Sequence, residues 1–163
     1  MEKWDAYNKD GSKSGFDLLR GAPIPIGAYQ IVSEVLVKHV DGSFLLMQRD
    51  WNKEGYPGFF EAGASGGVLK GESPYQGAAR ELFEETGIVS NDLTLVFAQS
   101  NMKDTFFYGF LCTANCPKES IVLQEGETIS YRWLNEAEFL KFMHGEEFVP
   151  TQRERWLPFL NNI

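Results

Sequence analysis

The stretch GGVLKGESPYQGAARELFEETGI, residues 66–88, carries the clearest structural signal in this chain. Ser73 can cap a helix, Pro74 suits the first helical position, and Gln76 completes a capping box three residues after the cap. Gly87 stands where a residue in the left-handed conformation commonly ends a helix. Together these signals predict one helix between Ser73 and Gly87.

Three carboxylates crowd the last turns of this helix. Glu81, Glu84 and Glu85 follow the i, i+3 and i+4 spacing, so they lie on one face. Like charges one turn apart repel each other, and the helix C-terminus already carries partial negative charge. Arg80 can pair with Glu84, but one guanidinium cannot neutralise three carboxylates. The face is therefore either simply solvated or a site for cations.

The surroundings of the acidic face favour a cation site. The glycine-rich loop before the helix lets the backbone approach an ion closely, and Glu72 adds a carboxylate just before the cap. Apolar residues anchor the rest of the helix: Ala78, Ala79, Leu82 and Phe83. Clustered carboxylates with oxygen donors suit a hard cation such as Mg²⁺ or Mn²⁺.

The spacing of the fixed residues resembles the Nudix box, G-x5-E-x7-R-E-U-x-E-E-x-G-U, in which U is aliphatic. Gly66 is followed after five residues by Glu72, and after seven more by the run from Arg80 to Ile88. Every fixed position matches. The resemblance implies an α/β/α sandwich of the α+β type with a mixed sheet, and a catalytic loop–helix–loop at 66–88. It also implies hydrolysis of a nucleoside diphosphate linked to another moiety, with Mg²⁺ or Mn²⁺.

The resemblance further implies roles for single residues. Glu81 and Glu85 would be metal ligands, and Glu84 would be a further ligand or a close neighbour of the metal. The backbone carbonyl of Ser65 would add another ligand. Arg80 would act mainly by orienting the carboxylates, together with Glu72.

An attacking water needs a carboxylate that accepts its proton. In the family this base is either a glutamate of the box or one on a later loop. Glu125 and Glu127, in LQEGETISYRWL, precede a predicted strand and are the later candidates. The alternative is an exposed acidic loop.

Candidate substrate contacts lie between residues 49 and 60. Arg49 and Lys53 could meet phosphate oxygens through charge-assisted hydrogen bonds, or they could be ordinary surface charges. Trp51 could stack on a base, although packing of the loop against the sheet is the simpler role for it and for its aromatic neighbours.

The similarity extends beyond the box. WDAYNKDGSKSG…LRG and LLMQRD…K…YPGFFE resemble the Nudix branch that contains isopentenyl-diphosphate isomerases and their hydrolase-like relatives. Those isomerases carry a cysteine and a histidine where this chain has Ser65 and Gly67. A serine hydroxyl is a much weaker acid than a thiol, which argues against isomerisation and for hydrolysis. A non-catalytic nucleotide-binding module is the third alternative, and the retained glutamates argue against it.

The composition limits the partners. The chain has 163 residues and a formal net charge of −8, which argues against binding to nucleic acid polymers or anionic membranes but not against a small-molecule diphosphate. Cys112 and Cys116 are expected to be free thiols. The N-terminus lacks the apolar run of a signal peptide, and no segment has the length of a membrane span, so we expect a cytoplasmic protein. The sequence leaves open whether the chain forms a homodimer through the N-terminal hairpin or the sheet edge.

The remaining elements follow from local patterns. We expect a single domain over 1–163, in which residues 1–28 form a hairpin turning at Asp10-Gly11 and then a connector. Strands are predicted at Tyr29–Val40 and Phe44–Gln48, paired as a hairpin, and at Leu93–Ser100, Thr105–Cys112 and Thr128–Leu134. Further helices are predicted from Asn135 to Phe142 and over Thr151–Leu160, the latter interrupted at Pro158. Residues 49–67 read as a functional loop with a short extended segment near Phe59–Glu61.

Overall fold

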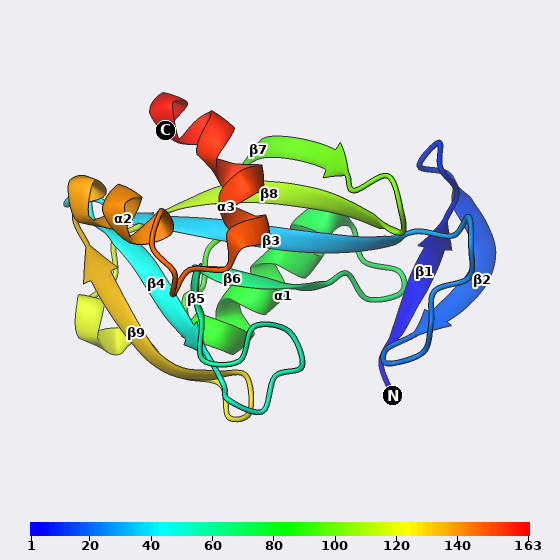
Figure 1. Cartoon of the computed structure of the whole chain (residues 1–163), viewed down its shortest axis with the longest axis horizontal. Coiled ribbons are helices and arrows are strands. Elements are labelled where there is room, and N and C mark those ends of the chain that lie inside the picture. The colour runs from blue at the N-terminus through cyan, green and yellow to red at the C-terminus, as the bar shows by residue number, and fades with distance from the viewer.

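A mixed β-sheet organises the protein, and a separate two-stranded hairpin stands at its N-terminal end (Figure 1). The computed structural model describes residues 1–163, apart from the side chain of Asn162. The strands are β1 (Lys3–Tyr7), β2 (Lys13–Leu19), β3 (Gln30–His39), β4 (Phe44–Arg49), β5 (Phe60–Ala62), β6 (Ala64–Gly67), β7 (Leu93–Ser100), β8 (Thr105–Ala114) and β9 (Thr128–Leu134). The helices are α1 (Pro74–Thr86), α2 (Glu136–Met143) and α3 (Pro150–Trp156), with short 3₁₀ turns η1 (Lys118–Ser120) and η2 (Leu157–Asn162).

The long strand β3 lies at the centre of the sheet. It runs parallel to β8 along its whole length, and the other strand pairs of this sheet are antiparallel. The main order is β5-β4-β3-β8-β7, with β6 paired to β3 and β9 paired to β4. The predicted mixed sheet is therefore confirmed.

The predicted hairpin of β3 and β4 opens soon after its turn. Lys38 lies opposite Phe44, and from there the two strands diverge. β5 then pairs with β4, while β6 pairs with β3 from Val32 to Val35. The expected extended segment near Phe59–Glu61 corresponds to β5, but reading the remainder of 49–67 as a loop missed β6. Its sequence, ASGG, lacks the β-branched and aromatic residues that mark strands.

Two hydrophobic cores cover the two faces of the sheet. Side chains alternate along a strand, so Val35 and Val37 of β3 point to one face and Leu36 points to the other. The first face packs against α1 through Ala78 and Leu82. The second face packs against α2, α3 and η2, through residues that include Phe139, Met143, Trp156 and Leu160. The layers are those of the predicted α/β/α sandwich.

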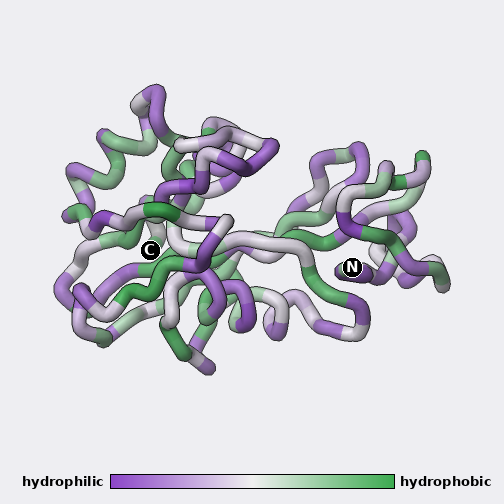
Figure 2. Tube along the Cα trace, turned by 90° about the horizontal axis from the view of Figure 1, so that it is seen from below, coloured by the Kyte–Doolittle hydropathy of each residue, from purple (hydrophilic) through white to green (hydrophobic). Residues whose placement is uncertain are grey.

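The N-terminal hairpin is firmly attached to this sandwich at one end of the sheet (Figure 2). Tyr7 and Tyr29 exchange two backbone hydrogen bonds of 2.9 Å, and their side chains share a small core with Ile31 and Val68. The carboxylate of Asp5 accepts a 2.8 Å hydrogen bond from the backbone N–H of Gly71, just before α1. The hairpin therefore holds a defined position against the loop that leads into α1.

The helix ends agree with the sequence signals. Ser73 caps α1 with both hydrogen bonds of a capping box to Gln76, and Gly87 ends the helix at φ 78°. Asn135 caps α2 in the same way. The final helix was predicted over Thr151–Leu160 with an interruption at Pro158; in the structure α3 ends at Trp156 and the chain continues as the 3₁₀ turn η2, which contains Pro158. In the part of the chain that the structure describes, no helix has the length and apolar character needed to cross a membrane.

Candidate active site

A cavity of about 260 Å³ lies where α1, β3, β6 and the N-terminal hairpin meet. Its wall includes the box glutamates Glu81, Glu84 and Glu85, together with Ser65 and Gly66 of β6. The structure therefore brings the predicted metal-ligating residues to one place. Further charged residues from outside the box line the same cavity: Glu2, Arg20, Lys53 and Glu127.

Gly66 allows the carboxylate of Glu81 to sit directly against β6. A Cβ atom added at Gly66 would lie 2.2 Å from the carboxyl carbon of Glu81, far inside van der Waals contact. Because β6 is paired with β3, the backbone at Gly66 cannot simply move away. A side chain at residue 66 would therefore displace the Glu81 carboxylate from its position against β6.

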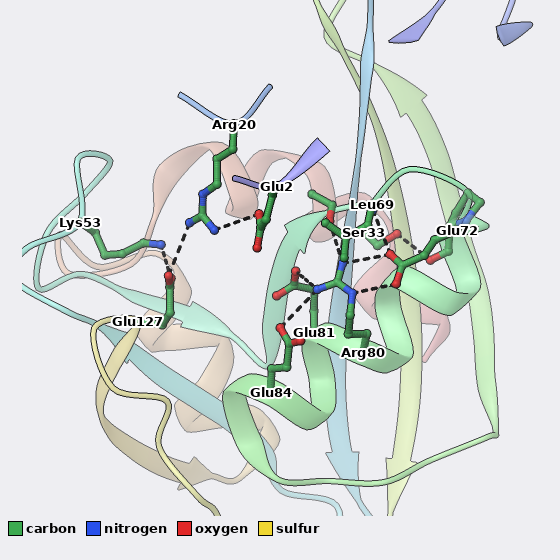
Figure 3. A network of polar contacts seen from close by, with 12 residues as sticks. Glu2, Arg20, Ser33, Lys53, Leu69, Glu72, Arg80, Glu81, Glu84 and Glu127 are labelled. Atoms are coloured by element: carbon green, nitrogen blue, oxygen red, sulfur yellow. Dashed lines mark hydrogen bonds and ion pairs between the residues drawn. The ribbon is translucent and has the colours of Figure 1, made fainter. Parts of the chain in front are cut away.

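Arg80 is the hub of a polar network along α1 (Figure 3). Its guanidinium donates to both oxygens of Glu72 at 2.8 and 3.0 Å and to the carbonyl of Gly67 at 2.9 Å. The same group donates to Glu81 at 2.7 Å and to Glu84 at 3.2 Å. Burial would lower the pKa of Arg80, but its bonds to Glu72 and Glu81 outweigh burial and raise that pKa. The guanidinium stays charged and ties the start of the box to the acidic turns.

Glu85 is buried, with 5% of its surface exposed, and its Oε2 has no hydrogen-bond partner among the described residues. Burial raises the pKa of Glu85 well above its ordinary value, and the negative charges of Glu61 and Glu81 add to this effect. Burial also raises the pKa of Glu81 to about 7, although Arg80 acts in the opposite direction. These glutamates are therefore held where ionisation is costly unless a positive charge arrives.

Glu61 on β5 is a further carboxylate next to this site that the sequence analysis did not single out. It is buried and accepts hydrogen bonds from Nη1 of Arg49 at 3.2 and 3.3 Å, and from Oγ of Ser65 at 3.4 Å. Burial raises the pKa of Glu61, while the charge of Arg49 opposes this effect. The only local signal was a charged residue inside the apolar run FFEA.

The donor set fits a hard divalent cation by its chemistry. All the donors are oxygens, and Glu85 Oε2 is a buried acceptor without a partner in the described part of the chain. Glu81 and Glu84 are turned toward Arg80, and among the described residues no three carboxylate, imidazole or thiol side chains converge on one ion position. Binding of an ion would therefore require Glu81 and Glu84 to turn from Arg80 toward Glu85.

Glu127 faces the acidic helix from the other side of the cavity, just before β9 (Figure 3). It forms an ion pair with Lys53 and a 3.5 Å contact with Nη2 of Arg20, whose Nη1 lies 3.1 Å from Glu2. Of the two later glutamates in the sequence analysis, Glu127 lines the cavity and Glu125 is exposed. Sequence reasoning missed Arg20, because nothing local connects residue 20 with residue 127.

A second cavity, of about 610 Å³, adjoins the first and shares Gln30, Val32 and Ser65 with it. Arg49 lines this second cavity rather than the first. Trp51 lies on the outside of its loop, 67% exposed, where its ring covers Gly58. The candidate substrate contacts thus separate into Lys53 at the acidic cavity, Arg49 beside it, and Trp51 on the loop surface. The rest of the lining of the second cavity includes Tyr56, Asn101, Phe107 and Arg155.

Known proteins have similar sequences. A family model described as the NUDIX domain matches residues 29–154. An uncharacterised Nudix hydrolase of Listeria monocytogenes is 29% identical over 154 residues, covering 92% of this chain and 89% of that protein. A second uncharacterised Nudix hydrolase, from Listeria innocua, is 28% identical over 158 residues with the same coverage.

Solved structures share the fold. The crystal structure of DR0079 from Deinococcus radiodurans matches with a TM-score of 0.79 at 17% identity, over 97% of this chain and 99% of that one. The MutT protein from Methanosarcina mazei Go1 matches with a TM-score of 0.63 at 26% identity, over 82% and 94% of the two chains. Because the family model spans most of the sequence, the chain belongs to the Nudix family, and it is an enzyme of the Nudix hydrolase type.

Proposed function

We propose that this enzyme cleaves a diphosphate linkage in a nucleoside diphosphate derivative or a related organic pyrophosphate, with Mg²⁺ or Mn²⁺ as cofactor. The observation that carries the proposal is the set of glutamates around one cavity, with an unpaired buried oxygen on Glu85. The whole chain, residues 1–163, would act as one catalytic unit. The isomerase alternative lacks support, because Ser65 stands on the cavity wall where that reaction would use a thiol.

Glu81, Glu84 and Glu85 would hold the cation, together with the backbone carbonyl of Ser65. When bound, the cation polarises the diphosphate and lowers the pKa of the attacking water. Arg80 would act as a positioning residue, because it holds the carboxylates of Glu81 and Glu84 until the ion binds and ties them to Glu72.

The remaining residues would bind the substrate and move the proton. Lys53 lies at the acidic cavity and would contact phosphate oxygens. Glu127, opposite the helix, would accept the proton of the attacking water. The adjoining larger cavity, with Arg49 on its wall, would take the rest of the substrate. The position of Trp51, outside on its loop, supports a packing role for that ring.

The proposal is tested with a panel of nucleotide sugars, dinucleotides, nucleoside triphosphates and coenzymes, each with Mg²⁺ and with Mn²⁺. We expect hydrolysis of at least one member, and a decrease in kcat of about 100-fold or more in Glu85→Gln and in Glu127→Gln. Glu125→Gln is the matched control for Glu127→Gln, because it makes the same change on the same loop at an exposed position.

Two results would contradict this proposal. One is a folded wild-type protein that hydrolyses no member of the panel. The other is formation of an allylic isomer from isopentenyl diphosphate, included on the same panel, because this product would mean that the enzyme is an isomerase despite Ser65. A fall in kcat that is as large in Glu125→Gln as in Glu127→Gln would contradict the role assigned to Glu127.

A further inference from the structure

The N-terminal hairpin lies outside residues 29–154, the part matched by the family model, yet it forms part of the wall of the catalytic cavity. Glu2, Trp4 and Arg20 all line this cavity. The hairpin is held in place by backbone hydrogen bonds between Tyr7 and Tyr29. Because the hairpin forms part of the cavity wall, its side chains can contact a molecule that binds in the cavity.

Two positively charged side chains from distant parts of the chain contact the same carboxylate in this cavity. Oε1 of Glu127 contacts Arg20 of the hairpin, and Oε2 of Glu127 contacts Lys53. One carboxylate thus bridges a guanidinium and an ammonium, in the way that oxygens of a phosphate group would. A diphosphate carries more negative charge than one carboxylate, so it can compete for both cations.

The same wall contains a hydrogen-bond donor without an acceptor. Nε1 of Trp4 is buried and has no partner among the described residues. It lies beside Gly67, where an added Cβ would come within 2.8 Å of Nε1. A buried N–H group without an acceptor is destabilising, and an incoming phosphate oxygen would satisfy it.

We propose that the N-terminal hairpin is a substrate-binding element, in which Arg20 binds the diphosphate jointly with Lys53 and Trp4 Nε1 donates to it. The substrate takes over both cations from Glu127. The carboxylate of Glu127 is then released beside the diphosphate, where it can accept a proton. The inference rests on the proposed function, since it names residues that bind that substrate and explains how Glu127 becomes available.

The test is calorimetric binding of methylenediphosphonate, a non-hydrolysable diphosphate, to the full chain with Mg²⁺. Arg20→Gln is expected to weaken binding at least about tenfold, the effect of losing one charge-assisted hydrogen bond. Trp4→Phe keeps an aromatic side chain but removes the N–H, and should weaken binding about fivefold. Lys13→Gln is the matched control, because it removes one positive charge from the same hairpin at a side chain paired with Asp5.

Glu127→Gln supplies the distinguishing readout. If Glu127 competes with the diphosphate for Arg20 and Lys53, this variant binds methylenediphosphonate more tightly than the wild type, although its kcat falls. A merely structural role for the ion pairs would weaken binding in Arg20→Gln and Glu127→Gln alike. Thermal melts of all variants test whether they are folded.

Three results would overturn the inference. Arg20→Gln and Lys13→Gln could bind the probe with equal affinity, or Glu127→Gln could bind it more weakly than the wild type. The third is a wild type that does not bind the probe. A wild type that binds methylenediphosphonate as expected but hydrolyses no substrate would contradict the proposed function instead. The two failures are therefore separate.

Discussion

At the scale of single residues, the acidic turns of α1 place carboxyl groups where the protein alone stabilises their ionised form poorly. Burial raises the pKa of Glu81 and of Glu85, and Oε2 of Glu85 has no partner among the described residues. Arg80 offsets part of this charge but is shared among three carboxylates. Ionisation of these carboxyl groups therefore destabilises the protein until a cation binds, and this loss of stability is measurable.

The stability of the metal-free protein is expected to fall as the pH rises from about 4.5 to 7. Glu81 has a pKa of about 7 in the fold and an ordinary value of 4.5, so the folded state holds its proton more tightly than the unfolded state. The stabilisation that protonated Glu81 contributes is complete below its pKa in the unfolded state, and it is lost as the pH rises past its pKa in the folded state. For Glu81 its size is about 3 kcal/mol.

Thermal melts in chelator at several pH values measure this effect. Glu81→Gln should reduce the pH dependence of stability without abolishing it, because the amide cannot ionise while Glu85 still can. Mg²⁺ or Mn²⁺ should raise Tm more at pH 8 than at pH 5.5, since the ion binds the ionised carboxylates. A Tm gain from the metal that does not change with pH would contradict the assigned ligands.

At the scale of elements, α1 is specified mainly by its ends. The capping box of Ser73 and Gln76 satisfies two backbone groups, and Gly87 supplies the left-handed ending. Oγ of Ser33 on β3 donates a 2.7 Å hydrogen bond to the carbonyl of Pro74, which ties the first turn to the sheet. The glutamates proposed to bind the cation lie on the later turns, so the start of the helix should affect stability more than chemistry.

Ser73→Ala should therefore lower stability by about 1 kcal/mol, the usual cost of losing a helix N-cap. For a protein of this size the corresponding decrease in Tm is about 2–4 °C. Activity well below Tm should stay close to that of the wild type. Asn135→Ala removes the same kind of cap from α2 on the other face of the sheet and serves as the comparison. A large loss of activity in Ser73→Ala alone would show that the cap positions the glutamates.

At the scale of the whole molecule, a buried ion pair joins the C-terminal helix to the central strand. Glu34 of β3 pairs with Arg155 of α3 and accepts a 3.0 Å hydrogen bond from Nε1 of Trp156. Burial raises the pKa of Glu34, while Arg155 and Trp156 act in the opposite direction. The fold therefore depends on residue 155 to stabilise residue 34.

Arg155→Ala should destabilise the protein by about 3–5 kcal/mol, because it leaves a buried carboxylate without its cation. The loss of stability should grow as the pH rises, since Glu34 would then have to ionise without a neighbouring cation. Adding Glu34→Gln to Arg155→Ala should restore part of the stability, and a double-mutant cycle from denaturant unfolding measures the coupling. Additive effects of the two changes would contradict the pairing.

The elements that could be predicted are those with local causes. Leu93–Ser100 and Thr128–Leu134 were predicted with the bounds that the structure gives, and so were the ends of α1. β6 could not be predicted, because ASGG has no strand pattern and is a strand only through its pairing with β3. The parallel pairing of β3 with β8 was equally invisible, since it joins residues about 75 positions apart, as Gln30 and Thr105 show.

In the candidate site, too, the residues that could be predicted are those whose placement has a local cause. The sequence by itself determined the helix, its acidic face and the family, because these depend on spacing within 23 residues, from Gly66 to Ile88. Only the tertiary structure decided that Glu127, rather than Glu125, faces the cavity, and that Arg20 and Glu61 lie beside it. Short-range spacing follows from helix geometry, whereas contacts between distant segments depend on how the sheet and the hairpin pack together.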